Sequence, residues 1–196
     1  MSVVSECILR ADFFSSFKNI FEAKNKRALK IHSETTDISS VLLAISVASK
    51  NYLEGVDISF DIESDLRLSA DILEIDFINL ILNVLSFSVI NAKDEVRVSL
   101  NKVDNFAEIE FAFASEFDFN LLGDNNLENS RLNSSLSLLI AITLSEIYSI
   151  PFRFEKRESI YRLILNLPVR ASSELVFSKR DNLDEKIKRQ LQAIFF

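Results

Sequence analysis

The chain has 196 residues, 48% hydrophobic and 26% charged, with a formal net charge of −7, so it can bury the core of one domain. Its acidic balance argues against nonspecific nucleic-acid binding, which depends on basic surface. One cysteine excludes an internal disulfide and a Cys-based zinc site, and two glycines are too few for the phosphate loops of P-loop or dinucleotide-binding proteins.

The N-terminal region does not resemble a signal peptide. Glu6, Arg10, Asp12 and Lys18 interrupt any apolar stretch there, and no other run reaches the length of a membrane span without charges. The lone cysteine is typical of a reducing compartment. We therefore expect a cytoplasmic protein with no membrane and no nucleic-acid partner.

Apolar residues at helical spacing predict a leading helix over residues 4–25. Its stripe is long and aromatic, so it should dock on the domain or on a second copy of the chain. The stripe consists of Val4, Cys7, Ile8, Ala11, Phe14, Phe17 and Phe21. Residues 28–32 alternate like a short strand, and Asp37 is a good N-cap for a helix from Ile38 to about Leu53.

The middle of the chain predicts two strands, a buried helix and a hairpin. Residues 56–63 alternate as a strand with one buried face, and residues 66–70 form a shorter strand. Apolar spacing of three and four predicts a central buried helix from Asp76 to Ala92. Strands over residues 95–103 and 107–114 are joined by a turn at Asp104-Asn105.

The last third begins with a polar stretch, residues 116–133, which we interpret as a long loop. Ser134 is expected to cap a second buried helix to about Ser149, and strands over residues 152–156 and 161–167 follow. A polar linker then leads to an amphipathic helix over residues 182–196. Its stripe should dock on the domain or on a partner rather than on a membrane, and it comprises Leu183, Ile187, Leu191 and Ile194.

This order of elements predicts an α/β (α+β) fold. We expect a two-layer sandwich, with a mixed sheet of about five or more strands, helices on one face, and flanking N- and C-terminal helices. Residues 1–27 should hold the N-terminal helix, residues 28–169 the domain, and residues 170–196 the linker and C-terminal helix.

Three runs in the last part of the domain carry a resemblance to a known family. They are Ser135-Leu136-Ser137-Leu138, Glu146-Ile147-Tyr148-Ser149-Ile150 and Leu167-Pro168. From about Ala28 to Pro168 the chain resembles the ATP-binding domain of sensor histidine kinases, the GHKL or Bergerat fold. The family has Gly-Leu-Gly-Leu, Glu-aliphatic-His-Gly-Gly and Leu-Pro at these places, so the spacing is retained and the glycines are absent.

The central helix resembles the family's asparagine box, Asn-Leu-Leu-x-Asn-Ala, in one of two registers. In the register that we prefer, Asn83 opens the box and Phe87 occupies the place of the asparagine that holds magnesium in the family. The alternative opens at Asn79 and keeps that asparagine as Asn83, but it puts Asp76 at a buried position. Burying an unpaired carboxylate costs several kcal/mol, which favours the first register.

The family's third motif, Asp-x-Gly-x-Gly, contacts the adenine amino group and should follow the strand at residues 108–113. The run Phe113-Ala114-Ser115-Glu116-Phe117-Asp118 lacks it. The resemblance thus implies a domain that has lost its nucleotide motifs, with no catalytic residue, no cofactor and no metal. We expect Phe87, Phe113 or Phe117 to fill the old pocket. The degenerate nucleotide-site positions are Asn79, Asn83, Phe87, Phe113, Ser115, Ser135 and Ser137.

His32 is the only histidine and hence the only candidate phosphoacceptor. The family's acceptor lies on a helix and is followed by Glu or Asp, whereas His32 lies on a predicted strand and is followed by Ser33. We expect an ordinary strand histidine. An acidic cluster is interleaved with apolar residues, so we expect a solvated face rather than a metal site; it comprises Asp61, Asp65, Asp71, Glu74 and Asp76.

The sequence therefore predicts a non-enzymatic regulatory protein that binds a sensor kinase or a response regulator, with a homodimer through the N-terminal helix left open. Two alternatives remain. A histidine phosphotransferase with a vestigial ATPase domain requires His32 to be exposed on a helix. An atypical nucleotide-binding kinase requires Asn83 and an open cleft between the central helix and the loop at residues 116–133.

Overall fold

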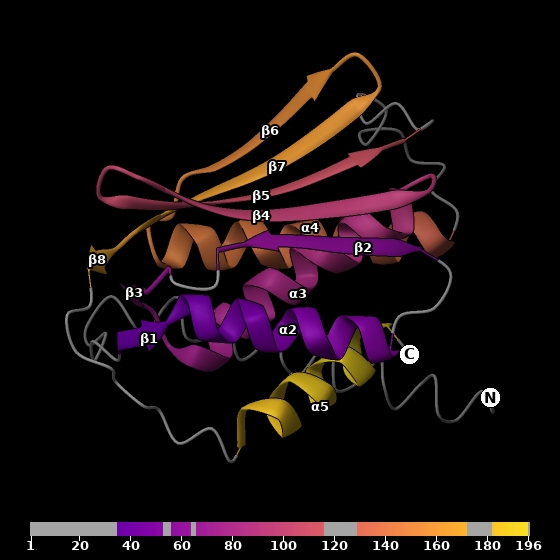
Figure 1. Ribbon diagram of the computed structural model, residues 1–196. Helices are drawn as coiled ribbons and strands as arrows, with labels where there is room; N and C mark the ends of the chain where they lie inside the picture. The colour runs from indigo at the N-terminus through magenta and orange to yellow at the C-terminus, as the bar shows by residue number, and fades with distance from the viewer. Residues whose placement is uncertain (1–34, 53–55, 64–65, 116–128, 172–181, 196) are drawn as a thin grey trace.

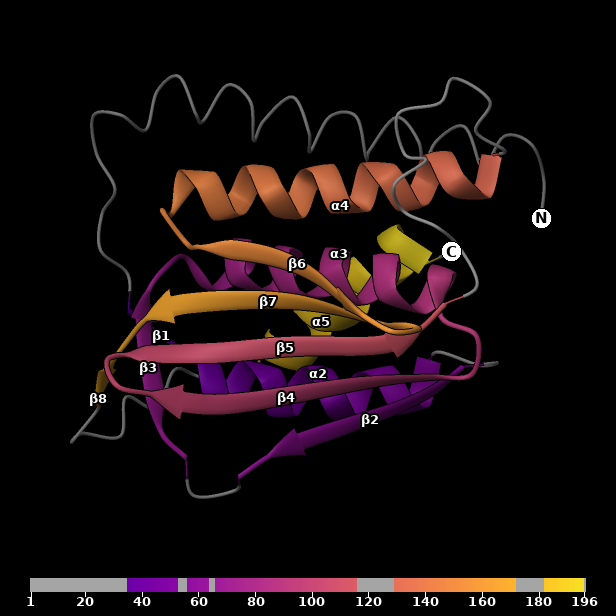
Figure 2. The same ribbon diagram turned by 90° about the horizontal axis from the view of Figure 1, so that it is seen from above.

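The computed structural model describes residues 35–52, 56–63, 66–115, 129–171 and 182–195. Its main sheet has five strands in the order β2 (Asp57–Ile62), β4 (Glu95–Val103), β5 (Phe106–Ala114), β7 (Ile160–Pro168) and β6 (Phe152–Arg157). β2 and β4 run parallel and the other pairs antiparallel. The helices α2 (Ile38–Tyr52), α3 (Glu74–Asn91) and α4 (Asn129–Ile147) cover one face (Figures 1 and 2). The predicted two-layer sandwich is confirmed.

The sheet has one buried and one solvated face, as the alternation of its strands predicts. Its inner face buries three residues from β4 and four each from β5 and β7: Val96, Val98, Leu100, Ala107, Ile109, Phe111, Phe113, Tyr161, Leu163, Leu165 and Leu167. On the outer face, Arg153 pairs with Glu108 at 3.3 Å and Arg162 with Glu110 at 3.1 Å. The strands therefore contribute apolar surface to one layer only.

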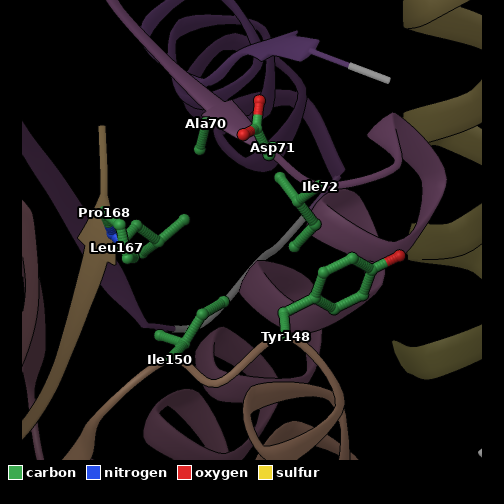
Figure 3. A pocket seen from close by; sticks show the side chains of 7 residues that line it. All are labelled: Ala70, Asp71, Ile72, Tyr148, Ile150, Leu167 and Pro168. Atoms are coloured by element: carbon green, nitrogen blue, oxygen red, sulfur yellow. The ribbon is translucent and has the colours of Figure 1, made fainter. Parts of the chain in front are cut away.

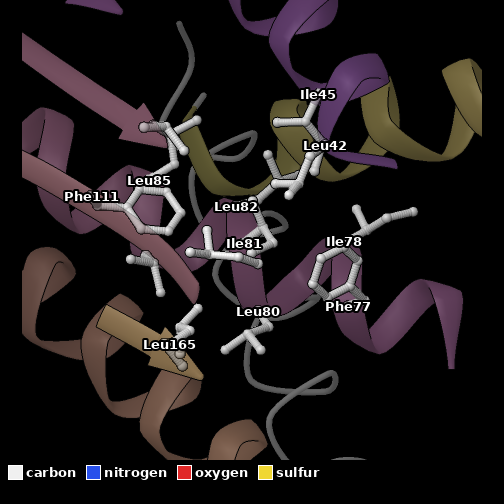
Figure 4. Close-up of a cluster of buried hydrophobic side chains, with 14 of the residues drawn as sticks. Leu42, Ile45, Phe77, Ile78, Leu80, Ile81, Leu82, Leu85, Phe111 and Leu165 are labelled. Carbon is white, nitrogen blue, oxygen red and sulfur yellow. The ribbon is translucent and has the colours of Figure 1, made fainter. Parts of the chain in front are cut away.

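α3 is the central element of the core. Every residue from Asp76 to Ser88 is buried except Asn79, which is half-buried. Side chains of α2, β5 and β7 gather around it (Figure 4). α3 is long and apolar enough to cross a membrane, but 67% of it is buried inside the fold. The apolar composition of α3 is explained by its place inside the fold, where no side of the helix faces water.

The C-terminal helix α5 (Leu183–Phe195) docks on the domain, on the side of α2 and α3 that faces away from the sheet (Figure 1). Its predicted stripe is confirmed, because Leu183, Ile187 and Leu191 are all buried. Lys186 Nζ also lies 2.7 Å from Glu74 Oε1 at the start of α3. The main sheet, α2 and α4 cover three sides of α3, and α5 covers the fourth.

A second, three-stranded sheet was not predicted. It consists of β1 (Thr35–Asp37), β3 (Leu68–Asp71) and β8 (Arg170–Ala171), all antiparallel. The strand predicted over residues 66–70 is confirmed as β3, whereas β1 and β8 were not predicted, because strands of two or three residues are too short for alternation to be recognised. The predicted cap at Asp37 is confirmed, since its carboxylate accepts hydrogen bonds from the Ser40 N–H at 3.0 Å and the Ser40 hydroxyl at 2.7 Å.

The predicted start of α4 is wrong. The helix begins at Asn129, within the stretch assigned to a loop, and Ser134 lies inside it rather than capping it. Leu132 stands four residues before Leu136, so the helical spacing extends further back than the polar composition suggests. The N-terminal helix over residues 4–25, the strand at residues 28–32 and residues 116–128 of the predicted loop lie outside the described residues.

Replacing Ile187 by Ala should lower the free energy of unfolding by about 2–5 kcal/mol, because the side chain is fully buried. Lys186→Ala should cost less than about 1 kcal/mol, since its ion pair is exposed to solvent. Urea titration of the full chain measures both. Gln192→Ala, on the exposed side of the same helix, is the matched control, and an Ile187→Ala variant as stable as this control would contradict the docking of α5.

Candidate functional site

The predicted nucleotide-site positions lie where α3, α4 and the end of β5 meet. α4 presents a side of small residues, Ser137, Ala141 and Ser145, each at most 5% exposed. Ser137 Oγ lies 3.5 Å from Ser86 Oγ of α3, at the outer limit of a hydrogen bond. Small side chains let two helices approach closely, so α4 packs directly on α3 along this seam.

Asn83 is the polar residue at the centre of α3. It is 3% exposed, and its Nδ2 donates a hydrogen bond to the Asn79 carbonyl oxygen at 2.8 Å. Its Oδ1 has no hydrogen-bond partner among the described residues. A buried polar atom without a partner costs about 1–3 kcal/mol. Among the described residues, Asn83 is thus the buried side chain whose oxygen makes no hydrogen bond, and this calls for an explanation other than packing.

Four rings form a second feature, the aromatic cluster of Phe87, Phe113, Phe154 and Tyr161. Phe87 packs edge-on against Phe113 at 6.2 Å and Phe154 at 6.5 Å between ring centroids. Tyr161 stacks on Phe113 at 6.0 Å and on Phe154 at 5.6 Å. Phe87 and Phe113 are at most 2% exposed. Phe87, Phe113 and Tyr161 fill the space between the second half of α3 and the inner face of β5 and β7, and Phe154, which is 41% exposed, lies at its edge.

Asp76 departs from the prediction of a solvated acidic face. It is 7% exposed, and its Oδ2 accepts a hydrogen bond from the Tyr148 hydroxyl at 2.5 Å. The pair joins the start of α3 to the residue just after α4, so the seam has polar contacts at both ends. Because Asp76 is buried and paired, its burial no longer argues against the register that opens at Asn79. That reason for preferring Phe87 at the magnesium position was wrong.

The remaining predicted residues are placed as follows. Ser115 follows β5, is half-buried, and its N–H donates to the Ser159 carbonyl at 3.4 Å. Ser135 lies in α4, but its side chain falls outside the description, as do His32 and Phe117 entirely. Among the described residues no group of three or more His, Cys, Asp or Glu is arranged to hold a metal ion.

Sequence reasoning missed the Asp76–Tyr148 pair and two members of the aromatic cluster. The alternation of the last two predicted strands could have placed Phe154 and Tyr161 on the inner face of the sheet. The family pattern could have drawn attention to Tyr148 as a site residue, because Tyr148 stands where that pattern has a histidine. Its contact with Asp76 joins residues 72 positions apart, and no local pattern predicts it.

A small cavity lies at the other end of α4. Its volume is about 210 Å³, and it is lined by Ala70, Asp71, Ile72, Tyr148, Ile150, Leu167 and Pro168. Figure 3 shows the Tyr148 ring at its edge with the hydroxyl directed away from it. The cavity lies between the small sheet and the main sheet, because residues of β3 and β7 both line it. None of the predicted nucleotide-site residues lines it.

Solved structures supply the comparison that sequence does not, since no family model and no curated protein matches the chain. Acinetobacter baumannii histidine kinase AdeS superposes with a TM-score of 0.63 at 9% identity, over 87% of each chain. The chain has the fold of a histidine kinase ATP-binding domain. The mycobacterial sensor histidine kinase MprB gives 0.57 at 14% identity, over 71% of this chain and 99% of its own.

The histidine kinase domain of the Escherichia coli osmosensor EnvZ agrees, with a TM-score of 0.54 at 12% identity over 75% of this chain and 95% of its own. At these identities the likeness establishes the fold alone. The resemblance inferred from spacing is thus confirmed as a resemblance of fold, and the chemistry of the site must be argued from its residues.

Replacing Asn83 by Leu should raise the free energy of unfolding by about 1 kcal/mol, because it removes a buried oxygen without a partner. Chemical denaturation measures the change. Asn79→Leu, one turn earlier and half-buried, is the matched control and should have little effect. A destabilised Asn83→Leu variant would mean that the oxygen has a partner in the folded protein.

Tyr148→Phe should lower the free energy of unfolding by about 1.5–3 kcal/mol, because a hydroxyl that donates to a buried carboxylate is lost. The double variant with Asp76→Asn completes a thermodynamic cycle, and we expect a coupling energy between the two sites of at least about 0.5 kcal/mol. Strictly additive effects would show that the two ends of the seam are not coupled through this contact.

Proposed function

We propose that this protein is a non-catalytic signalling module with the fold of a histidine kinase ATP-binding domain. It acts in the cytoplasm by binding a sensor kinase or a response regulator, and it turns over no nucleotide. Such a module works by offering, or occupying, the surface that a kinase domain presents to its partner. A module of this kind needs a stable scaffold with exposed surfaces and no catalytic residue.

The observation that carries this proposal is the aromatic cluster. The resemblance puts the adenine-contacting motif just after β5, beside Phe113. A ligand entering there must displace Phe113 or Phe87, and removing a buried phenylalanine ring from a core costs about 3–5 kcal/mol. That cost would reduce the affinity for a nucleotide by several hundredfold or more.

The described residues also do not fit a magnesium–triphosphate group. Where the resemblance has two glycines at the start of the last helix, the chain has Ser135 and Ser137, whereas a phosphate cradle needs exposed backbone amides and close approach. Asn83 Oδ1 is a single amide oxygen, and it is buried beneath the packed seam of α3 and α4. Magnesium prefers carboxylate and phosphate oxygens in an open octahedral site.

A second candidate function is atypical nucleotide binding through Asn83. It is supported by the unpartnered Oδ1, because the fold keeps a destabilising amide at the position that the register opening at Asn79 assigns to the metal ligand. This candidate requires the seam between α3 and α4 to open. Phosphotransfer through His32 stays a prediction of the sequence, because His32 lies outside the described residues.

Isothermal titration calorimetry with ATP and ADP, each with and without magnesium, tests the two candidates. We expect no binding heat up to millimolar nucleotide. Micromolar binding would overturn the non-catalytic proposal. If the Asn83→Leu variant then loses that binding while remaining folded, Asn83 is the ligand residue. If the variant still binds, nucleotide is held elsewhere and both candidates fail.

A further inference from the structure

β6 forms one edge of the main sheet. Among the described strands it hydrogen-bonds to β7 alone, and β2 forms the opposite edge. Figure 1 shows β6 at the margin of the sheet, where the twist of the strands carries it away from the helices. An edge strand can pair with a strand of another chain, so β6 is a candidate interaction surface.

The register of β6 on β7 determines which backbone groups point to the outer edge. The Pro151 carbonyl accepts a hydrogen bond from the Asn166 N–H of β7 at 3.1 Å, so Pro151 directs its carbonyl toward β7. In an antiparallel pair this direction alternates from one residue to the next. Three residues of β6 therefore direct their N–H and C=O groups away from β7: Phe152, Phe154 and Lys156.

The side chains along this edge combine both signs of charge with aromatic surface. Arg153 and Glu155 lie on the outer face of the sheet, where Arg153 pairs with Glu108 at 3.3 Å. Their side chains are 51% and 32% exposed, so a second strand can reach both. On the inner face, Phe154 is 41% exposed at the margin of the aromatic cluster. A strand added beside β6 would cover more of this ring.

A second copy of β6 is complementary to the first in one antiparallel register. Because every second residue directs its backbone outward, the twofold registers that pair most of β6 are centred on Arg153, Phe154 or Glu155. The first sets Arg153 opposite itself, and the last sets Glu155 opposite itself. The register centred on Phe154 instead sets each Arg153 opposite a Glu155 of the other copy. Opposite charges in facing positions stabilise strand pairing and like charges oppose it, so the charges select this register.

The opposite edge of the sheet lacks this property. β2 carries two charged residues, Asp57 and Asp61, and both are exposed. Since both charges are negative, no register of two β2 strands pairs opposite charges. Charged side chains on an edge strand are a common protection against pairing. Self-complementary charge therefore distinguishes β6 from β2.

We propose that the outer edge of β6 binds the β6 of a second copy of this chain, antiparallel and centred on Phe154. The two Phe154 residues then stand opposite each other, each Phe152 stands opposite a Lys156, and the two five-stranded sheets become continuous. The contact is isologous, because the same residues contribute from both copies. It is distinct from a homodimer through the N-terminal helix, and it does not depend on the proposed function.

Charge reversal at the facing positions tests the contact, with the full chain studied by sedimentation velocity over a series of concentrations. We expect a monomer–dimer equilibrium. Arg153→Glu and Glu155→Arg should each raise the dissociation constant of the dimer about tenfold, since each variant sets like charges opposite each other at two places. The double variant should restore dimerisation, and so should an equimolar mixture of the two single variants. Arg97→Glu, on the same face of β4 and 66% exposed, is the matched control and should leave the constant unchanged.

A monomer at every concentration would overturn the proposal. If both single variants dimerise as well as the unaltered chain, the contact lies on another surface, and a double variant that stays weakened would overturn the register. Hydrogen exchange of the unaltered chain gives a measurement that does not depend on the folding of any variant. The amides of Phe152, Phe154 and Lys156 should exchange more slowly as the concentration rises, while those of β2 should not change. Unchanged exchange at β6, or equal protection at both edges, would contradict the β6 contact.

Discussion

The burial of α3 around its whole circumference is the constraint on which the rest of the structure depends. A helix that is apolar on every side needs four neighbours, and the chain supplies them from the sheet, α2, α4 and α5. Each of these elements packs a buried side against α3. Polar groups of α3 need partners inside the protein: Asp76 accepts from the Tyr148 hydroxyl, and the Ser88 hydroxyl donates to the Val84 carbonyl at 2.8 Å. Asn83 Oδ1 is the exception among the described residues.

The same enclosure is the basis of the proposal that this chain acts without catalysis. AdeS, MprB and EnvZ are histidine kinases with this architecture, so the arrangement of sheet and helices is compatible with catalysis. In this chain, aromatic rings occupy the space beside the end of β5, and α4 lies directly on α3. Both features add packed side chains at the place where a nucleotide site of this fold would need an open cleft. A scaffold of this kind retains its outer surfaces, which is what a binding module requires.

Much of the fold could be predicted from the sequence because its main elements are long and periodic. α3, the β4–β5 hairpin and the stripe of α5 followed directly from spacings of two and of three to four. Of the small sheet only β3 could be predicted, because β1 and β8 are too short to show a period. The start of α4 was misplaced because polar composition was given more weight than Leu132. The argument about Asp76 failed for another reason: a carboxylate judged as unpaired has a partner far away in the sequence, and burial is costly only without one.

The position of α5 has a consequence for folding during synthesis. α5 covers α2 and α3, which precede it in the sequence by about a hundred residues, so both helices are synthesised before it. Until residues 183–191 have emerged from the ribosome, the side of α2 and α3 that α5 covers in the finished fold is exposed to water. A nascent chain with such an exposed apolar surface is a state to which chaperones can bind.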